Sequence, residues 1–286
     1  MANIIELAAK AKINLSLDIT GRRENGFHEL ATVMQNVELS DTVRLEKSDR
    51  IEIKSNLFYL PVDQKNIAYK MAAHFFRETG IRGGVKITLT KRIPVAAGMA
   101  GGSSNGAAVL KGLNKLYETG LTLEDMQAMS IPIGSDIPFC LLGGTALVTG
   151  IGEVTERLPP LPPCRIVLCK PAFGISTEAA YRAYDLHTAF SHPDTEKMVN
   201  ALKAGDLSTV AGTMRNVLEE VVTAPGEIAR IERIMLEHGA VGARMSGSGP
   251  TVFGIFAERE KADACRKALS SMYRDTWSVL PERLPI

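Results

Sequence analysis

Apolar and polar residues alternate without a break near the start of the chain. The alternation runs through Lys12, Ile13, Asn14, Leu15, Ser16, Leu17, Asp18 and Ile19. A period of two residues predicts a β-strand, with the polar side chains on one face and the apolar ones on the other. An exposed sheet face gives this pattern in most antiparallel strands, so the simpler interpretation puts the polar face in water. The polar residues 20–28 that follow contain Asn25-Gly26, a pair that suits a hairpin turn.

The rest of the chain mixes strand-like and helix-like periodicity. It predicts further strands at 29–39, 42–53, 85–89, 165–169, 251–256 and 276–280. It predicts helices at 66–77, 107–117, from 122 onward, and at 176–187, 194–204, 207–222, 226–238 and 258–271. Strands interleaved with helices in both halves indicate an α+β fold of two lobes.

A proline-rich stretch gives the clearest sign of a domain boundary. Residues 158–163 read Leu-Pro-Pro-Leu-Pro-Pro. Proline cannot occupy the interior of a helix or a central strand, and clustered prolines favour a stiff, extended connection. We therefore expect an N-terminal lobe over 1–158, a linker over 159–163 and a C-terminal lobe over 164–286.

A glycine-rich loop connects the strand at 85–89 to the helix that follows. It comprises Pro94, Val95, Ala96, Ala97, Gly98, Met99, Ala100, Gly101, Gly102, Ser103 and Ser104. The glycines let the backbone come close to a ligand, and the two serines are good helix-capping residues. Free amides and the positive end of the helix dipole then form an anion site. The loop has the features of a phosphate cradle.

This loop differs from two common nucleotide-binding motifs. A Walker A loop is excluded because no Gly-Lys dipeptide occurs in the chain, and the dinucleotide fingerprint Gly-x-Gly-x-x-Gly is also absent. A glycine-rich turn that simply packs a helix closely on a sheet remains the structural alternative. The tandem serines and the leading proline favour the phosphate cradle.

Two more loops carry candidate chemistry. Residues 133–139 place Asp136 between apolar neighbours, where its carboxylate would be ordered, although an aspartate after serine is often a turn or cap residue. Residues 245–251, Met-Ser-Gly-Ser-Gly-Pro-Thr, form a second glycine–serine loop that enters a strand. A flexible turn is the alternative there. Two glycine loops in separate predicted lobes suggest a ligand held between them.

Composition excludes several classes of protein. The chain has 286 residues, 45% of them hydrophobic and 23% charged, and a net charge of +1, so nothing points to nucleic acid or a charged surface as partner. Cysteines 140, 164, 169 and 265 form no C-x-x-C pair, which argues against metal or disulfide roles and fits a reducing cytoplasm. Neither a signal peptide over residues 1–12 nor a run of roughly 18 apolar residues is present. We expect a cytoplasmic protein.

Taken together, the loops resemble those of the galactokinase–homoserine kinase–mevalonate kinase–phosphomevalonate kinase (GHMP) superfamily. Residues 94–104 are similar to its phosphate loop, Pro-x-x-x-Gly-Leu-x-Ser-Ser, in a glycine-richer form. A closer match, to the kinases of the non-mevalonate isoprenoid route, comes from the segments 11–15, 21–22, 26–28, 134–136 and 247–250. The resemblance runs in order from residue 11 to about 254. It implies an N-terminal β/α lobe and a ferredoxin-like C-terminal lobe.

The resemblance also implies a reaction and its residues. ATP with Mg²⁺ phosphorylates a hydroxyl group of a small substrate that carries cytidine diphosphate. Asp136 is implied as the catalytic carboxylate and Lys12 as the cation beside it, while residues 94–104 bind ATP. Asn66 lies where the family recognises adenine, though asparagine is equally common as a helix cap. The hydroxyl of Ser104 is a candidate ligand for Mg²⁺.

The substrate's cytidine group is implied to contact a further set of residues. These are Asn14, Phe27, His28 and Tyr181, while Gly247, Ser248 and Gly249 are implied to bind the substrate without being assigned to its cytidine group. A ring that stacks on a flat base, with a histidine at its edge, makes a reasonable pyrimidine pocket. Each aromatic residue could instead belong to the core, and Tyr184 could stack in place of Tyr181. Phe27 stands where the family has tyrosine, which removes a phenolic hydrogen bond but keeps the ring.

Three alternatives stay open. The chain could be another small-molecule kinase of the superfamily, acting on homoserine or mevalonate, which would not need the Gly26-Phe27-His28 block. It could be a nucleotide-binding module without catalysis, although the presence of both Lys12 and Asp136 argues against this. It could also be a structural protein with glycine loops of no catalytic use, which ATP would not stabilise.

Overall fold

The computed structural model describes residues 3–284, which form two compact units. Unit 1 contains the described residues up to Ala11, together with Leu39–Ile93 and Ala100–Leu142. Unit 2 contains Lys12–Glu38, Pro94–Met99 and the described residues from Gly143 onward. Both units are discontinuous because two long strands, β1 (Ile4–Arg22) and β2 (His28–Ser48), each run from one unit into the other.

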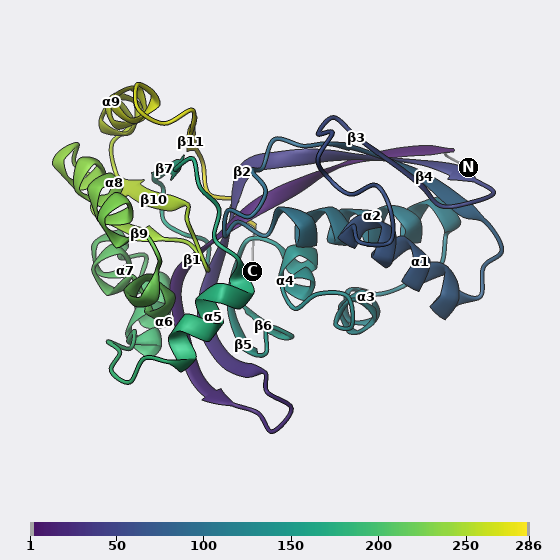
Figure 1. The fold of residues 1–286 in the computed structure, drawn as a ribbon, viewed down its shortest axis with the longest axis horizontal. Helices are drawn as coiled ribbons and strands as arrows, with labels where there is room; N and C mark the ends of the chain where they lie inside the picture. The colour runs from purple at the N-terminus through teal and green to yellow at the C-terminus, as the bar shows by residue number, and fades with distance from the viewer. Residues whose placement is uncertain (1–2, 285–286) are drawn as a thin grey trace. The chain divides into compact units, whose positions relative to one another are not determined.

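In unit 1, helices cover one face of a small sheet (Figure 1). β4 (Gly84–Thr90) pairs antiparallel with residues 42–48 of β2, and β3 (Glu52–Ser55) pairs parallel with β4. The helices are α1 (Ile67–Thr79), α2 (Gly101–Tyr117), α3 (Leu123–Ser130) and α4 (Ile137–Leu142). Alternate residues of the strands, such as Val43, Leu45 and Ile87, pack against α1 and α2 in the core of this unit.

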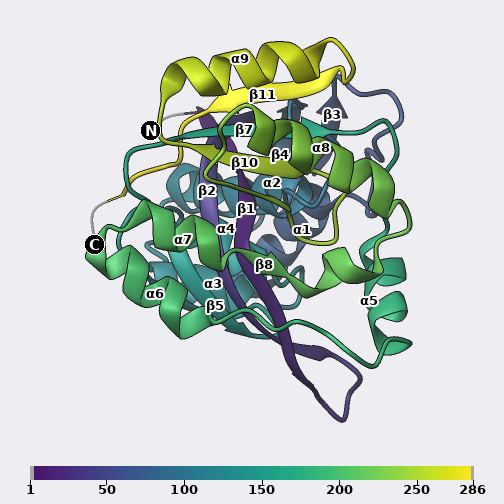
Figure 2. The same cartoon turned by 90° about the vertical axis from the view of Figure 1, so that its left-hand side faces the viewer.

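In unit 2, a sheet has the antiparallel strand order β11-β7-β10-β9, and Figure 2 shows β11, β7 and β10 side by side. These strands are β7 (Arg165–Lys170), β9 (Gly242–Met245), β10 (Val252–Phe256) and β11 (Asp275–Val279). Helices α8 (Pro225–Glu237) and α9 (Arg259–Ser270) pack on the sheet and bury residues such as Ile231 and Cys265. Apart from the elements that lie between β7 and α8 in the chain, the order β7-α8-β9-β10-α9-β11 is the βαββαβ pattern of a ferredoxin-like lobe. The sequence resemblance implied this lobe.

The remaining elements of unit 2 connect this sheet to the halves of β1 and β2 in the same unit. β5 (Thr145–Gly150) pairs with β2 at residues 30–35 and with β6 (Val154–Arg157), and β8 (Arg215–Asn216) pairs with β1 at Ser16 and Leu17. The other elements are α5 (Thr177–Asp185), α6 (Thr195–Ala204), α7 (Leu207–Thr213) and the 3₁₀ helix η1 (Val217–Val221).

The structure corrects several expectations about single elements. The strands expected at 29–39 and 42–53 are largely one strand, β2, because Asp41 does not make a turn but accepts hydrogen bonds from the backbone of residues 92 and 93. The helix expected over 207–222 is broken at Met214, whose ψ of 126° is extended. β5, β6 and β9 were not expected, since they are short and lack clear alternation.

The proline-rich stretch forms no helix or strand. It does not separate the two compact units, however, because residues on both sides of 159–163 belong to unit 2. The length of β1 and β2 explains the difference, since each contributes residues to both units. The division of the chain into lobes at 159–163 stays a prediction.

Within residues 3–284, no helix is long and apolar enough to cross a membrane. The cysteines at 140, 164, 169 and 265 are free thiols, and burial raises the pKa of Cys164, Cys169 and Cys265 to about 12. A thiol with such a pKa is almost entirely protonated near neutral pH and is a poor nucleophile or metal ligand.

Unit 2 also contains a pair of neighbouring buried carboxyl groups. Glu219 of η1 accepts a hydrogen bond from the backbone N–H of Met245, 2.7 Å away, and Glu232 of α8 lies beside it, with Arg244 Nη1 at 4.0 Å. Burial, followed by the charge of Glu219, raises the pKa of Glu232 from its ordinary 4.5 to about 8. Burial also raises the pKa of Glu219. Near neutral pH, Glu232 therefore carries a proton in the folded state.

This pair predicts a pH dependence of stability. The folded state binds the Glu232 proton more tightly than the unfolded state, so the free energy of unfolding falls as pH rises from about 4.5 to about 8. Glu232→Gln removes the titrating group and retains a hydrogen-bond donor. The free energy of unfolding of this variant, relative to that of the wild type, should therefore be greater at pH 8.5 than at pH 5.5. Urea unfolding midpoints at the two pH values measure the effect. Glu237→Gln, at an exposed position of the same helix, is the control and should follow the wild type; equal pH dependence in all three proteins would contradict the prediction.

Candidate active site

The glycine-rich loop adopts an unusual backbone conformation. Ala96, Gly98 and Ala100 have φ values of 51°, 73° and 53°, in the left-handed region that alanine seldom occupies. Helix α2 begins directly afterwards at Gly101, and among the described residues no side chain caps its start. The first amides of α2 therefore lack partners within the helix and lie at the positive end of its dipole. This arrangement suits an anion such as a phosphate group.

The expected capping role of Ser103 and Ser104 is wrong. The helix starts two residues before Ser103, so both serines lie in its first turn. Ser104 Oγ instead donates to the backbone oxygen of Lys10 at 2.6 Å, and its side chain is almost completely buried. Ser104 thus joins α2 to β1 within unit 1.

Residues 94–99 lie against the second glycine loop, within unit 2. Ser246 Oγ donates to the backbone oxygen of Gly98 at 3.0 Å. A Cβ atom added at Gly98 would lie 2.1 Å from the Ser246 backbone oxygen and 2.9 Å from the Gly249 nitrogen. Such distances leave no space for any side chain. The two glycine motifs that the sequence presents separately therefore make backbone contact.

The polar face of β1 is buried and not exposed to water, which overturns the simpler interpretation of the alternation. Lys12 is 4% exposed and Asn14 is 1% exposed. Lys12 Nζ donates to Asn14 Oδ1 at 2.7 Å, and Asn14 Nδ2 donates to Thr32 Oγ1 at 2.8 Å. The backbone N–H of Asn14 donates to Ser246 Oγ, which brings β1 to the second glycine loop. A buried ammonium group needs such partners, and their arrangement fixes its position.

The second glycine loop is held by residues that carried no recognisable signal. Asn216 Nδ2 donates to the backbone oxygens of Met245 and Gly247 at 2.9 and 2.8 Å, and Glu219 accepts from the Met245 N–H. Thr177 and Ser248 share a hydrogen bond between their hydroxyl oxygens, 3.1 Å apart. The loop is buried and hydrogen-bonded at several points, which argues against a flexible turn. Asn216 was missed because it lies inside a stretch that reads as continuous helix.

An aromatic cluster surrounds His28. The His28 ring centroid lies 4.9 Å from that of Tyr181 and 6.0 Å from that of Tyr184, while His28 Nε2 is 2.7 Å from Asp185 Oδ1. Tyr184 stacks on Phe190, with 4.0 Å between ring centroids. Phe27 is 58% exposed and does not belong to the core. The structure thus brings together His28 and both candidate tyrosines, and it adds Asp185 and Phe190, which sequence reasoning missed.

Asp136 lies immediately before α4 and is half-buried, with its backbone oxygen accepting from the Cys140 N–H at 3.1 Å. The loop that carries it lies close to the start of α2. A Cβ atom added at Gly134 would lie 3.9 Å from Ser103 Oγ, and Ser104 Oγ is 3.4 Å from Cys140 Sγ. Within unit 1, Asp136 therefore belongs to a loop beside the helical end of the glycine-rich loop.

Asn66 caps helix α1, the alternative role that its residue type allowed. Its Oδ1 accepts from the Ala68 N–H at 2.9 Å and its Nδ2 donates to the Pro61 oxygen at 2.7 Å. Helix α1 also packs beneath the start of α2, since Cβ atoms added at Gly102 or Gly106 would each lie 3.0 Å from the Ile67 side chain. Glycine at 102 and 106 allows this close packing. Within residues 3–284, no group of three or more His, Cys, Asp or Glu side chains is arranged to hold a metal ion.

The contact at Gly98 generates a prediction. Gly98→Ala should lower the unfolding midpoint severely, because the new methyl group collides with backbone atoms of residues 246 and 249. Gly120→Ala is a matched control, since Gly120 has a similar φ of 69° with no atom of the described chain within 4 Å of an added Cβ. The control isolates the cost of the backbone conformation, about 1 kcal/mol. Thermal unfolding of both variants measures the difference, and equal losses would mean that the loops are not in contact.

Comparison with known proteins identifies the family. The family model "GHMP kinases N terminal domain" matches residues 66–144, and "GHMP kinases C terminal" matches residues 198–275. A protein of Alkaliphilus metalliredigens named 4-diphosphocytidyl-2-C-methyl-D-erythritol kinase is 45% identical over 95% of this chain and 94% of its own length. A protein of Listeria monocytogenes with the same name is 42% identical over 97% of this chain and 95% of its own length.

Solved structures agree with this result. The crystal structure of a 4-(cytidine 5'-diphospho)-2C-methyl-D-erythritol kinase matches with a TM-score of 0.82 and 33% identity, over 97% of this chain and all of that one. A homoserine kinase from Cytophaga hutchinsonii matches with a TM-score of 0.79 at 20% identity, over 99% and 96% of the two chains, which shows a shared fold. The chain belongs to the GHMP kinase family and, within it, to the 4-diphosphocytidyl-2-C-methyl-D-erythritol kinases.

Proposed function

We propose that this chain transfers the γ-phosphoryl group of ATP to the 2-hydroxyl of the methylerythritol part of 4-diphosphocytidyl-2-C-methyl-D-erythritol. The observation that carries the proposal is the shared name of relatives that are 41–46% identical over at least 86% of the chain. The uncapped start of α2 and the left-handed loop before it supply the phosphate-binding chemistry that the reaction requires.

Residues 94–104 bind the phosphates of ATP in this proposal. Their backbone amides donate to phosphate oxygens, and the left-handed residues at 96, 98 and 100 supply the kind of backbone conformation from which anion-binding nests are built. Asn66 lies at the adenine end in this proposal. Each polar atom of its side chain makes one hydrogen bond within unit 1, which fixes the turn before α1, and an amide can make further bonds to a base.

Asp136 and Lys12 carry the catalytic step. Asp136 accepts the proton of the substrate hydroxyl as its oxygen attacks the γ-phosphorus, and the bond from that phosphorus to ADP breaks. Lys12 supplies a fixed positive charge that stabilises the transferring phosphoryl group. The hydrogen bond from Lys12 Nζ to Asn14 supports this role because it holds the ammonium group in one place before substrate binds. Kinases depend on such positioning more than on covalent chemistry.

Mg²⁺ is part of the proposal as the partner of ATP. It neutralises charge on the phosphates and is commonly held by phosphate oxygens, water and one or two protein oxygens. In this proposal the ion is therefore held mainly through ATP. Among the described residues, no three or more His, Cys, Asp or Glu side chains are arranged to hold a metal ion without it. The Ser104 hydroxyl donates to Lys10 and is buried, so its observed contact supports a structural role in place of metal ligation.

The cytidine end of the substrate is assigned to the aromatic cluster of unit 2. His28 reads the edge of the base, and Asp185, at 2.7 Å, orients its ring. Tyr181 stacks on the base, because Tyr184 already stacks on Phe190 and its hydroxyl donates to the Ile19 oxygen at 3.4 Å. Exposed Phe27 covers a second face of the base. Asn14 also contacts the cytidine group in this proposal, and residues 247–249 bind the substrate.

The reaction is tested by consumption of Mg²⁺-ATP with three alcohols. The wild type should form a phosphomonoester from the cytidine substrate and none from mevalonate or homoserine, as measured by phosphorus NMR. Asp136→Asn should lower kcat by about 100- to 10,000-fold, the usual contribution of general-base catalysis, and leave the Kd for ATP within about twofold. Asp49→Asn, an exposed residue in the turn after β2, is the charge-matched control and should retain wild-type turnover.

Two outcomes would contradict this assignment. Turnover of homoserine or mevalonate would retain the GHMP kinase chemistry and reject the cytidine pocket. Loss of ATP binding in Asp136→Asn would make Asp136 a structural residue.

The choice between the tyrosines gives a separate prediction. Tyr181→Ala should raise the KM for the cytidine substrate about 2- to 13-fold, which corresponds to the loss of one stacking contact of about 0.5–1.5 kcal/mol, and leave the KM for ATP unchanged. Tyr184→Ala should leave both constants near their wild-type values, since the Tyr184 ring stacks on Phe190 and not on the base. Steady-state kinetics with each substrate varied in turn measures both. The reverse order of effects would assign the stacking role to Tyr184.

A further inference from the structure

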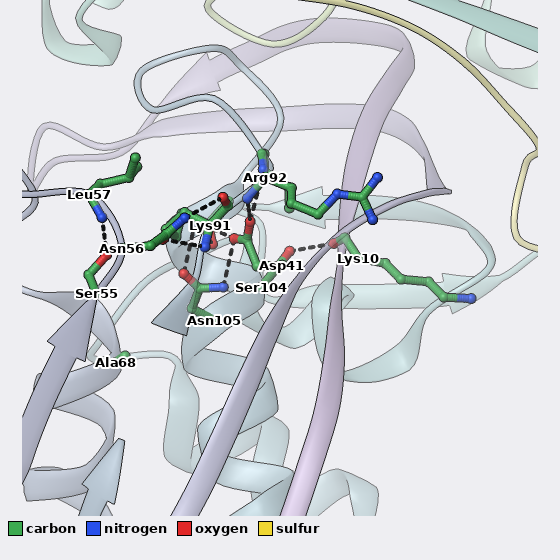
Figure 3. Close-up of polar contacts among 12 residues, drawn as sticks. Lys10, Asp41, Ser55, Asn56, Leu57, Ala68, Lys91, Arg92, Ser104 and Asn105 are labelled. Carbon is green, nitrogen blue, oxygen red and sulfur yellow. Dashed lines mark hydrogen bonds and ion pairs between the residues drawn. The ribbon is translucent and has the colours of Figure 1, made fainter. Parts of the chain in front are cut away.

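A buried network in unit 1 surrounds the carboxylate of Asp41, in the middle of β2. Asp41 is completely buried. Its Oδ1 accepts from the backbone N–H groups of Arg92 and Ile93 at 2.7 and 2.8 Å, and its Oδ2 accepts from Asn105 Nδ2 at 2.9 Å and from Lys91 Nζ (Figure 3). One carboxylate thus receives four hydrogen bonds from the two segments that flank residues 94–100.

Lys91 completes the network. Its Nζ donates to Asn105 Oδ1 at 2.9 Å and to the Gly101 backbone oxygen at 3.5 Å. The backbone of Lys91 is held from the other side by Asn56, which accepts from the Lys91 N–H at 2.8 Å and donates to the Lys91 oxygen at 3.2 Å (Figure 3). Every contact joins residues that precede residue 94 or follow residue 100.

The energetics of this network argue against a role in stability alone. A buried ion pair loses its hydration, and well-packed apolar residues often replace such a pair without loss of stability. The loop, by contrast, has a demanding conformation, since Ala96 and Ala100 occupy the left-handed region and Gly98 has a positive φ. Such residues persist only where the surrounding structure determines them. The network fixes both ends of the segment that contains them.

We propose that Asp41, Lys91 and Asn105 form a clamp that positions the phosphate loop, so that its amides are preorganised for the phosphates of ATP. The inference rests on the proposed role of residues 94–104 in binding ATP. None of the three side chains needs to touch the nucleotide: they are positioning residues. The clamp acts through the ends of the loop, which are Arg92 and Ile93 on one side and Gly101 and Asn105 on the other.

Asn105→Ala tests the clamp with little risk to folding, because alanine is a good helix former and the Asp41–Lys91 pair is retained. The Kd for Mg²⁺-ATP should rise about tenfold or more, while the KM for the cytidine substrate stays within about twofold. Asn114→Ala is the matched control. Asn114 lies near the other end of the same helix and bonds through its side chain to the Leu121 backbone at 2.8 and 3.0 Å. The Asn114→Ala variant should have a lower unfolding midpoint than the wild type and an unchanged Kd for ATP.

A second variant removes the charges together. Asp41→Asn combined with Lys91→Met leaves no unpaired buried charge, so it should fold and should weaken ATP binding further than Asn105→Ala. Calorimetry of ATP binding needs no alcohol substrate, so it tests the clamp even if the wild type phosphorylates a different alcohol. If Asn105→Ala and the double variant bind ATP as tightly as the Asn114→Ala control, the clamp is only a structural element. If the wild type binds no ATP, both the clamp and the proposed phosphate loop are wrong.

Discussion

The close approach of two glycine-containing backbones in unit 2 is the constraint on which the candidate site depends. The backbone at Gly98 lies so near residues 246 and 249 that a single methyl group would collide with both. Ser246 then donates to Gly98 and accepts from the Asn14 N–H, which joins β1 to the same point. Backbone amides can serve a ligand only where side chains do not occupy the space in front of them. Glycine at these positions meets a steric requirement and does not serve flexibility.

This constraint requires rigid support from outside the loops. Asn216 and Glu219 hold the backbone around residue 245 in unit 2, and the Asp41 carboxylate holds residues 92 and 93 in unit 1. These supporting groups are buried polar side chains, which are costly to bury unless their hydrogen bonds are made. A donor set fixed before the ligand arrives needs little reorganisation during reaction, and electrostatic catalysis benefits from this property.

Much of the fold follows from local pattern. The alternation in β1 and the periodicity of α1, α6 and α9 gave nearly correct elements, because the apolar residues of these segments recur with a period of two or 3.6 residues. Local pattern failed where a distant contact decided the conformation. β2 continues through Asp41 because that carboxylate bonds to the segment after β4, and the helix after residue 207 ends where Asn216 turns to the second glycine loop.

By itself, the sequence determined the α+β class, the order of most strands and helices, and the motifs through which the family is recognised. Those features depend on residue type and spacing along the chain. The tertiary structure decided that the polar face of β1 is buried, that Ser104 bonds to β1 and does not cap α2, and that Tyr184 is paired with Phe190. It also brought Asp41 and Asn216 into their supporting roles. The physical reason is that burial and hydrogen-bond partners are set by residues far apart in the chain, and no local period encodes which distant atom a side chain will meet.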